Sequence, residues 1–124
     1  MESQAQLQKF RVLRVESEES WEFFLSQAKD QSCPVVVHFT ASWCAPSIAM
    51  KHFFEELALN FQDILFLLVD VDEVKGVASK MEVKAMPTFI FFNGANQVDK
   101  IVGANPDEIK RRVASFAQSF RAHS

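Results

Sequence analysis

The pattern of apolar and polar positions predicts strands and helices that follow one another along the chain. Near-continuous apolar runs at 34–40 (PVVVHFT) and 64–72 (ILFLLVDVD) are typical of strands covered on both faces of a sheet. Shorter runs predict further strands at 11–15, 88–92 and 97–102. The NGAN stretch between the last two strands is a hairpin signal, so we expect these two strands to pair.

Helical spacing of apolar residues predicts four helices between these strands. In the first helix, Trp21, Phe24 and Ala28 fall on one stripe, and Ser17 is a plausible N-cap. The last helix opens with Asn105, an early proline and two acidic residues, which are favourable at a helix start. The predicted helices span 19–30, 47–61, 73–81 and 105–120.

The predicted order of elements is βαβαβαββα, which indicates an α/β fold. Strands that alternate with helices favour a mixed, mostly parallel central sheet with helices on both faces, and the hairpin adds an antiparallel edge. The chain of 124 residues has no internal repeat or linker. We therefore expect a single domain over residues 1–124, with a loose segment at 1–10.

Composition narrows the function classes without naming one. Apolar residues make up 48% of the chain and include thirteen phenylalanines, so a well-filled core is expected. The net charge of −3 is spread over both signs, which argues against a nucleic-acid or anionic-membrane surface. No run has the length of a membrane span and no secretory signal is recognised, so a cytoplasmic address is expected. There Cys33 and Cys44 would be free thiols.

The stretch WCAPS, residues 43–47, is the clearest candidate for chemistry. Cys44 follows a buried strand and a turn and comes just before a helix, so backbone N–H groups and the helix dipole would stabilise its thiolate. Pro46 fits the first helical turn, where its missing N–H costs little. The alternative is that Cys44 is only a small buried apolar residue. Because Trp43, Ala45 and Pro46 read as a surface turn, we favour a reactive thiol.

Three segments together resemble the thioredoxin family, and the similarity runs nearly end to end. They are VVVHFTASWCAPS, LVDVDEV and AMPTFIFFNGANQVDKIVGA. Within the family, WCAPS resembles the monocysteinic CxxS subgroup of plant thioredoxins. The resemblance implies a thioredoxin fold, thiol–disulfide exchange on protein disulfide substrates, and no cofactor.

The resemblance also implies roles for individual residues. Cys44 would be the attacking thiol and Pro87, after a cis Met86–Pro87 bond, would lie opposite it. The backbone of Met86 would bind an extended substrate segment. From the residues alone, AMPTF would be read instead as a trans proline at the start of an edge strand. The rest of the substrate groove would be formed by Trp43, Ala45, Pro46, Gly103 and Ala104.

Ser47 stands where a two-cysteine thioredoxin has its second thiol. A hydroxyl cannot release a mixed disulfide, so we expect Ser47 to hydrogen-bond the Cys44 thiolate and to open the helix. Another thiol must then resolve the intermediate. The substrate's own thiol would give disulfide isomerisation and glutathione a monothiol cycle, both with low net reductase activity. Cys33 precedes a strand of about seven residues at ~3.3 Å each, roughly 20 Å from Cys44, which excludes it as the resolving thiol.

Two other positions depart from the family pattern in a related way. His38 occupies the place of a usual buried aspartate, and Leu68 matches the position of a usual lysine. A buried carboxylate needs a partner, so the two changes belong together. His38 is a candidate proton relay, or alternatively a neutral buried histidine. His52 replaces a proline that commonly kinks the helix, and is expected at the surface.

Three function classes remain open at this point. The favoured one is a disulfide isomerase or thiol-transfer enzyme with Cys44 and Ser47 at its centre and glutathione or glutaredoxin-type thiols as partners. The second is a non-catalytic adaptor that binds partners in the groove. The third is a glutathione-linked monothiol glutaredoxin-like protein, although the loop VGANPDE departs from the glycine-rich glutathione loop of that class. The three histidines lack zinc spacing, so no metal is expected. The protein is expected to be a monomer.

Overall fold

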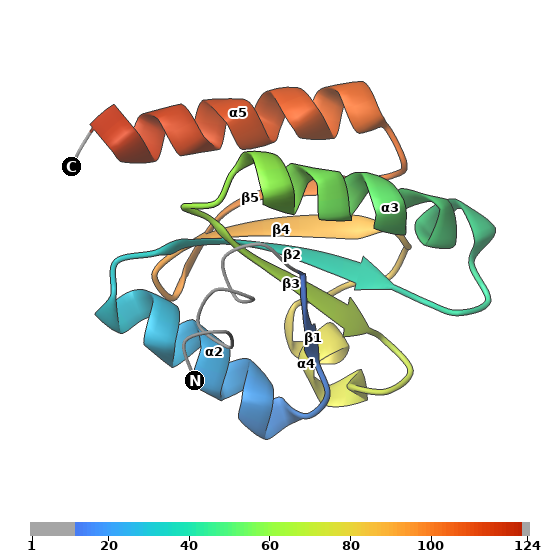
Figure 1. The fold of residues 1–124 in the computed structure, drawn as a ribbon. Coiled ribbons are helices and arrows are strands. Elements are labelled where there is room, and N and C mark those ends of the chain that lie inside the picture. Colours follow the sequence, from blue (N-terminus) through green and yellow to red (C-terminus); the bar gives the residue numbers. More distant parts are fainter. Residues whose placement is uncertain (1–11, 123–124) are drawn as a thin grey trace.

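The structure, a computed structural model, describes residues 12–122 of the chain. The expected loose segment at 1–10 and the first residue of the expected strand at 11–15 lie outside the described residues. Figure 1 shows a central sheet with helices above and below it.

Five strands form one mixed sheet in the order β1-β3-β2-β4-β5. The pairs β1–β3 and β3–β2 are parallel, whereas β4 pairs antiparallel with both β2 and β5. The expected mixed sheet with a parallel centre and an antiparallel hairpin edge is thus confirmed, although only two of the four strand pairs are parallel. The strands are β1 (Leu13–Val15), β2 (Pro34–Thr40), β3 (Leu65–Asp70), β4 (Thr88–Asn93) and β5 (Asn96–Val102).

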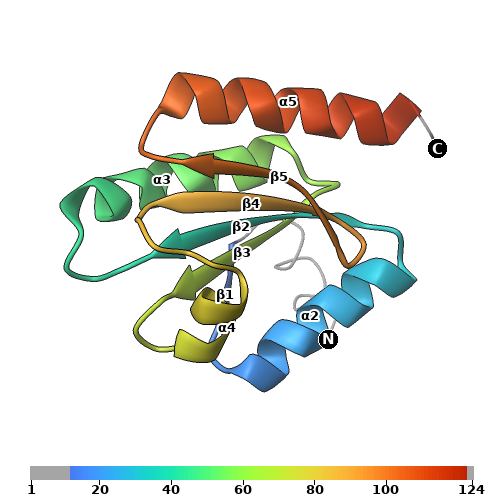
Figure 2. The ribbon, with the colours of Figure 1, turned by 180° about the vertical axis from the view of Figure 1, so that it is seen from behind.

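Four described helices cover the two faces of the sheet. Helices α3 and α5 lie on one face and α2 and α4 on the other, as the two opposite views show (Figures 1 and 2). The helix α2 starts with a capping box in which Ser17 accepts from the backbone of Ser20, so the predicted N-cap is confirmed. The helices are α2 (Glu18–Asp30), α3 (Ala45–Asn60), α4 (Lys75–Lys80) and α5 (Pro106–Ala122).

The core consists of two apolar layers, one on each side of the sheet. Aromatic rings fill the layer under α3 and α5, where Phe54 packs edge-on against Phe66 and lies close to Phe89. Trp21 anchors the opposite layer and contacts Phe39 and Phe92. The strand β2 is buried along its whole length because both layers cover it. This central strand ends at the candidate site.

Element ends differ from expectation by a few residues, each for a local reason. The strand β3 stops at Asp70, because the Asp70 carboxylate accepts from the backbone N–H of Asp72 at 2.8 Å and turns the chain. The helix α3 starts at Ala45, two residues earlier than expected, with Cys44 as its N-cap. The hairpin reverses at Gly94, whose φ of 65° is a conformation that favours glycine.

Candidate functional site

Cys44 lies where the buried strand β2 has given way to a turn and the helix α3 is about to start. Its backbone N–H donates to the carbonyl of Ala41 at 3.1 Å, and its carbonyl accepts the first helical bond, from Ile48 at 3.0 Å. The side chain is partly buried. The turn therefore places Cys44 at the N-terminus of a sixteen-residue helix, as its N-cap residue.

Two segments distant in sequence meet Cys44 at this end of the sheet. The thiol donates to the carbonyl oxygen of Met86, with 3.4 Å between Sγ and O. The Met86–Pro87 bond is cis, as the resemblance implied. The carbonyl of Pro87 accepts from the backbone N–H of Gly103 at 2.9 Å. Two hydrogen bonds and the Met86–Pro87 peptide bond thus connect the predicted residues Cys44, Met86, Pro87 and Gly103.

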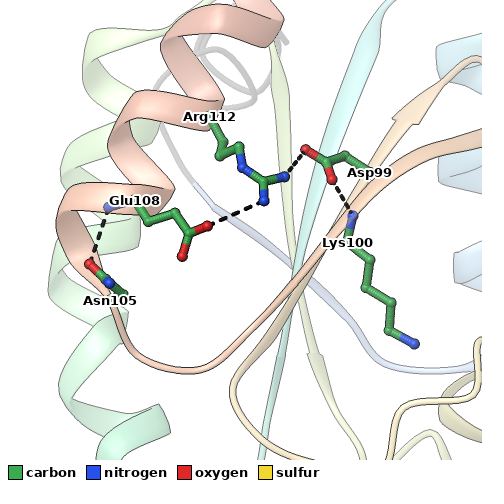
Figure 3. A network of polar contacts seen from close by, with 5 residues as sticks. All are labelled: Asp99, Lys100, Asn105, Glu108 and Arg112. Atoms are coloured by element: carbon green, nitrogen blue, oxygen red, sulfur yellow. Dashed lines mark hydrogen bonds and ion pairs between the residues drawn. The ribbon is translucent and has the colours of Figure 1, made fainter.

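The loop at Gly103 and Ala104 is held from both sides by polar contacts. Figure 3 shows Arg112 of α5 between the carboxylates of Asp99 on β5 and Glu108 on its own helix. Asn105 accepts from the backbone N–H of Glu108 at 3.2 Å and so caps α5, as its sequence position suggested. These contacts fix the angle between β5 and α5 and hence the loop that joins them.

Trp43 is held in place by a residue that sequence reasoning missed. Its indole Nε1 donates to the carboxylate of Asp72 at 2.8 Å, while 66% of the residue stays exposed. Asp72 follows the end of β3, and a polar residue just after a buried strand was the one available signal. The contact fixes the ring beside Cys44.

Several apolar residues of the segments that carry the predicted groove are exposed. The predicted groove residues Ala45, Pro46 and Ala104 are exposed. Ile48 and Val102, which sequence reasoning did not single out, are 44% and 59% exposed. Large exposed apolar side chains grouped at one place are typical of a binding surface. We call Trp43, Ile48 and Val102 the apolar rim of the site.

Ser47 does not lie where it was expected. Its side chain is fully buried, and its hydroxyl donates to Thr40 Oγ1 at 2.6 Å rather than to Cys44. The expectation that Ser47 opens the helix was also wrong, because Cys44 is the N-cap and Ser47 is the third helical residue. Side chains two residues apart in a helix point in directions about 200° apart. A helix that starts two residues earlier therefore directs Ser47 toward the sheet.

His38 is fully buried beside Ser47. Its ring stacks on Phe89 with 4.6 Å between centroids and meets the edge of Phe54. Nε2 lies 3.4 Å from Ser47 Oγ, and Nδ1 has no hydrogen-bond partner among the described residues. Burial, with a smaller effect from the charge of Lys51, lowers the pKa of His38 from 6.5 to about 3. The ring is therefore neutral at physiological pH.

The surroundings of His38 offer no carboxylate or amine from the neighbouring strand. Its partner in the parallel pairing with β3 is Leu68. Leu68 and Phe54 also line a pocket of about 70 Å³, which Lys51 borders from α3. The environment that Leu68 and Phe54 create is apolar, which explains the direction of the pKa shift of His38.

Cys33 lies at the opposite end of β2 from Cys44. It immediately precedes Pro34, so the whole strand Pro34–Thr40 and a turn separate the two thiols. Seven strand residues span about 23 Å, far beyond the reach of a disulfide. The Cys33 thiol lies near the carbonyl oxygens of Pro34 and Asp63, and burial raises its pKa. Neither cysteine is in a disulfide.

Other expected features can be located on the described part of the chain. His52 is exposed, as predicted, with Nε2 3.4 Å from Glu56 on the next helical turn. Between residues 12 and 122, no group of three or more His, Cys, Asp or Glu side chains could hold a metal ion. Within the same residues, no helix combines the length and apolar character needed to cross a membrane.

Comparison with known proteins agrees with the fold. The family model Thioredoxin matches residues 12–115. The chain belongs to the thioredoxin family, whose members carry out thiol–disulfide exchange on protein disulfides. Its fold is the thioredoxin fold.

The similar proteins include thioredoxin-like proteins CXXS1 and thioredoxins of the h type. Thioredoxin-like protein CXXS1 of Arabidopsis thaliana is 65% identical over 111 residues, which are 90% of this chain and 94% of that protein. Thioredoxin-like protein CXXS1 of Oryza sativa subsp. japonica is 54% identical over 89% of this chain and 83% of its own. Among solved structures, a poplar thioredoxin h mutant superimposes with a TM-score of 0.85 at 36% identity, covering 88% of this chain and 84% of that one.

Proposed function

We propose that this protein exchanges disulfides through a one-thiol cycle centred on Cys44, with isomerisation or thiol transfer as the outcome and low net reductase activity. The Cys44 thiolate attacks one sulfur of a protein disulfide. A mixed disulfide forms between Cys44 and the substrate, and the second substrate sulfur leaves as a thiolate. Trp43, Ala45, Pro46, Met86, Gly103 and Ala104 form the surface that binds the substrate segment around this bond, whereas Pro87 is buried and contributes through its cis bond to Met86.

An external thiol then completes the cycle. If another thiolate of the same substrate attacks the mixed disulfide, Cys44 leaves as a thiolate and the substrate carries a rearranged disulfide with no net oxidation. If glutathione attacks the substrate sulfur, one substrate sulfur becomes glutathionylated and the other stays reduced. A glutaredoxin-type thiol can serve in the same way. One copy of the chain suffices for either route.

The buried, inward orientation of Ser47 is the observation that carries this proposal. The position three residues after Cys44 is sealed in the interior by Thr40 and His38, and it holds no sulfur. Cys33, the one other cysteine of the chain, is separated from Cys44 by all of β2. Together these features support an attacking thiol that no internal thiol can reach.

The apolar rim favours a second candidate function, that of a non-catalytic adaptor. Trp43, Ile48 and Val102 are exposed, and a partner protein could bury them without any exchange. The two functions differ in whether the sulfur of Cys44 is needed.

Refolding of a protein with scrambled disulfides distinguishes the two functions. We expect the wild-type chain to accelerate reactivation in a glutathione buffer and Cys44→Ser to lose more than about 90% of that effect, because only a thiolate can attack the disulfide. Cys33→Ser is the matched control and keeps the wild-type rate. Insulin reduction by the wild type should stay close to background.

The outcome that contradicts the exchange function is equal reactivation by the wild type and Cys44→Ser. If the same two proteins also bind one partner with equal affinity, the adaptor function takes its place. Efficient insulin reduction by the wild type would instead contradict the one-thiol cycle.

A further inference from the structure

The N-terminal turn of α3 leaves one backbone donor in the position that matters for the Cys44 sulfur. A side chain at an N-cap accepts from the backbone N–H of the second or third helical residue. In α3 the second residue is Pro46, which has no N–H. The third residue is Ser47. Its backbone N–H is therefore the capping donor that an ionised Cys44 can use. The neutral thiol instead donates its proton to the carbonyl oxygen of Met86.

The side chain of Ser47 determines where that backbone donor lies. Its hydroxyl is fully buried and joins α3 to the end of β2 through Thr40. The second contact of the hydroxyl, with His38, reaches two residues further back along the same strand. Two contacts from one rigid strand hold the first turn of the helix against the sheet.

Counting protons assigns the tautomer of His38. A serine hydroxyl has one proton and can accept through its lone pairs. The proton of Ser47 is directed at Thr40 Oγ1 at 2.6 Å. The 3.4 Å contact with His38 is then a hydrogen bond only if Nε2 carries a proton and donates it. Nδ1 is the unprotonated nitrogen of this ring.

We propose that His38 is a positioning residue for Cys44, acting through Ser47. The Nε2–H group of His38 donates to the Ser47 hydroxyl, which donates to Thr40, and this buried chain fixes the Ser47 backbone N–H as a donor to the Cys44 thiolate. Phe89 and Phe54 hold the imidazole in the orientation that the contact needs. This inference rests on the proposed exchange function, since it concerns the reactivity of the same thiolate.

The tautomer can be tested without any substitution. Nitrogen-15 NMR of the histidine side chains separates protonated from unprotonated ring nitrogens. For His38 of the wild type near pH 7, we expect a protonated Nε2 and a bare Nδ1. The reverse tautomer would remove the hydrogen bond to Ser47 and overturn the proposal.

Reactivity is tested by the rate at which iodoacetamide alkylates Cys44, measured against pH in a Cys33→Ser background. His38→Leu should slow the reaction about threefold to tenfold at pH 7, because a capping hydrogen bond to the thiolate is loosened. His38→Gln, whose amide can donate to Ser47, should recover most of the rate. Val36→Ala is the matched control: it weakens the core on the same face of β2 but leaves the polar chain intact.

The variants separate a positioning role from a structural one. Slow alkylation of Cys44 in His38→Leu together with fast alkylation in Val36→Ala supports the proposal, even if both variants are less stable than the wild type. Equal rates for the wild type and His38→Leu overturn it, as does a Val36→Ala rate as low as that of His38→Leu. If His38→Leu does not fold, Thr40→Val replaces it, with the same expected loss of rate. In each case the exchange function stands or falls separately, on Cys44→Ser in the refolding assay.

Discussion

The two cysteines lie at opposite ends of one buried strand, and their surroundings differ in nearly every respect. Cys44 follows β2 and caps α3, beside an apolar rim and a cis proline loop. Cys33 precedes β2, lies against carbonyl oxygens and has a pKa raised by burial. A helix start offers N–H donors to a thiolate, whereas carbonyl oxygens offer nothing to it. The proposed exchange function therefore assigns the two cysteines different roles because they lie at different ends of β2.

The two thiols also differ in the side chains that surround them. Ser47 lies three residues after Cys44 and has a hydroxyl in place of a thiol, so it cannot attack a disulfide formed at Cys44. Around Cys33 no described side chain prepares the sulfur for exchange. In the proposed one-thiol cycle, the end of the sheet that carries Cys44 forms one disulfide bond with a substrate, and another thiol must release it.

The largest expected change comes from giving Cys44 a neighbouring thiol. Ser47→Cys places a sulfur one helical turn away, within the distance a disulfide needs. The introduced thiol can attack the mixed disulfide intramolecularly, so insulin reduction with an external reductant should rise by more than about tenfold. Turnover of insulin is the measurement.

The control for this gain is Ser47→Ala, which removes the hydroxyl without adding a sulfur. It should leave insulin reduction at the wild-type level. If Ser47→Cys also stays there although its new disulfide forms on oxidation, the absence of a second thiol is not what limits net reduction. The one-thiol account of this end of the sheet would then be wrong.

The next largest effect is the loss of stability at low pH that the buried His38 causes. His38 has a folded-state pKa of about 3, below its ordinary 6.5. The neutral ring therefore contributes stability that is present above pH 6.5 and is lost as pH falls through the folded pKa. The loss, on the order of a few kcal/mol, comes from protonating a ring that burial keeps neutral.

Urea unfolding of the wild type and His38→Leu at several pH values from 7 to 3 isolates this contribution. The carboxylates titrate in both proteins, so their effect cancels in the difference. We expect the free energy of unfolding of the wild type to fall more steeply on acidification than that of His38→Leu. Parallel curves would mean that His38 is protonated in the folded protein without cost.

The sequence was sufficient for the fold and for the location of Cys44 between a buried strand and a helix. The β-branched run of β2 and the alternation of elements predicted the sheet, and the turn before α3 located Cys44. The sequence did not predict the orientation of Ser47, because it placed the start of α3 two residues too late. A shift of two residues in a helix start changes the direction of the side chain from the surface to the interior. The contact of Trp43 with Asp72 joins residues 29 apart in sequence, and it depends on how two loops meet, which no periodicity reports.

The smallest expected effect concerns Cys33 and completes the comparison of the thiols. Because burial raises its pKa, less of Cys33 is ionised at pH 8 than of an exposed cysteine. Mass spectrometry of the alkylated wild type should show Cys33 modified at least about tenfold more slowly than Cys44. The protonated thiol also contributes a stability that is present below its unfolded pKa and lost as pH rises through the folded one. The free energy of unfolding should therefore fall less between pH 8 and pH 10 for Cys33→Ser than for the wild type. In the alkylation experiment, equal rates for the two thiols would remove the distinction between the two ends of β2.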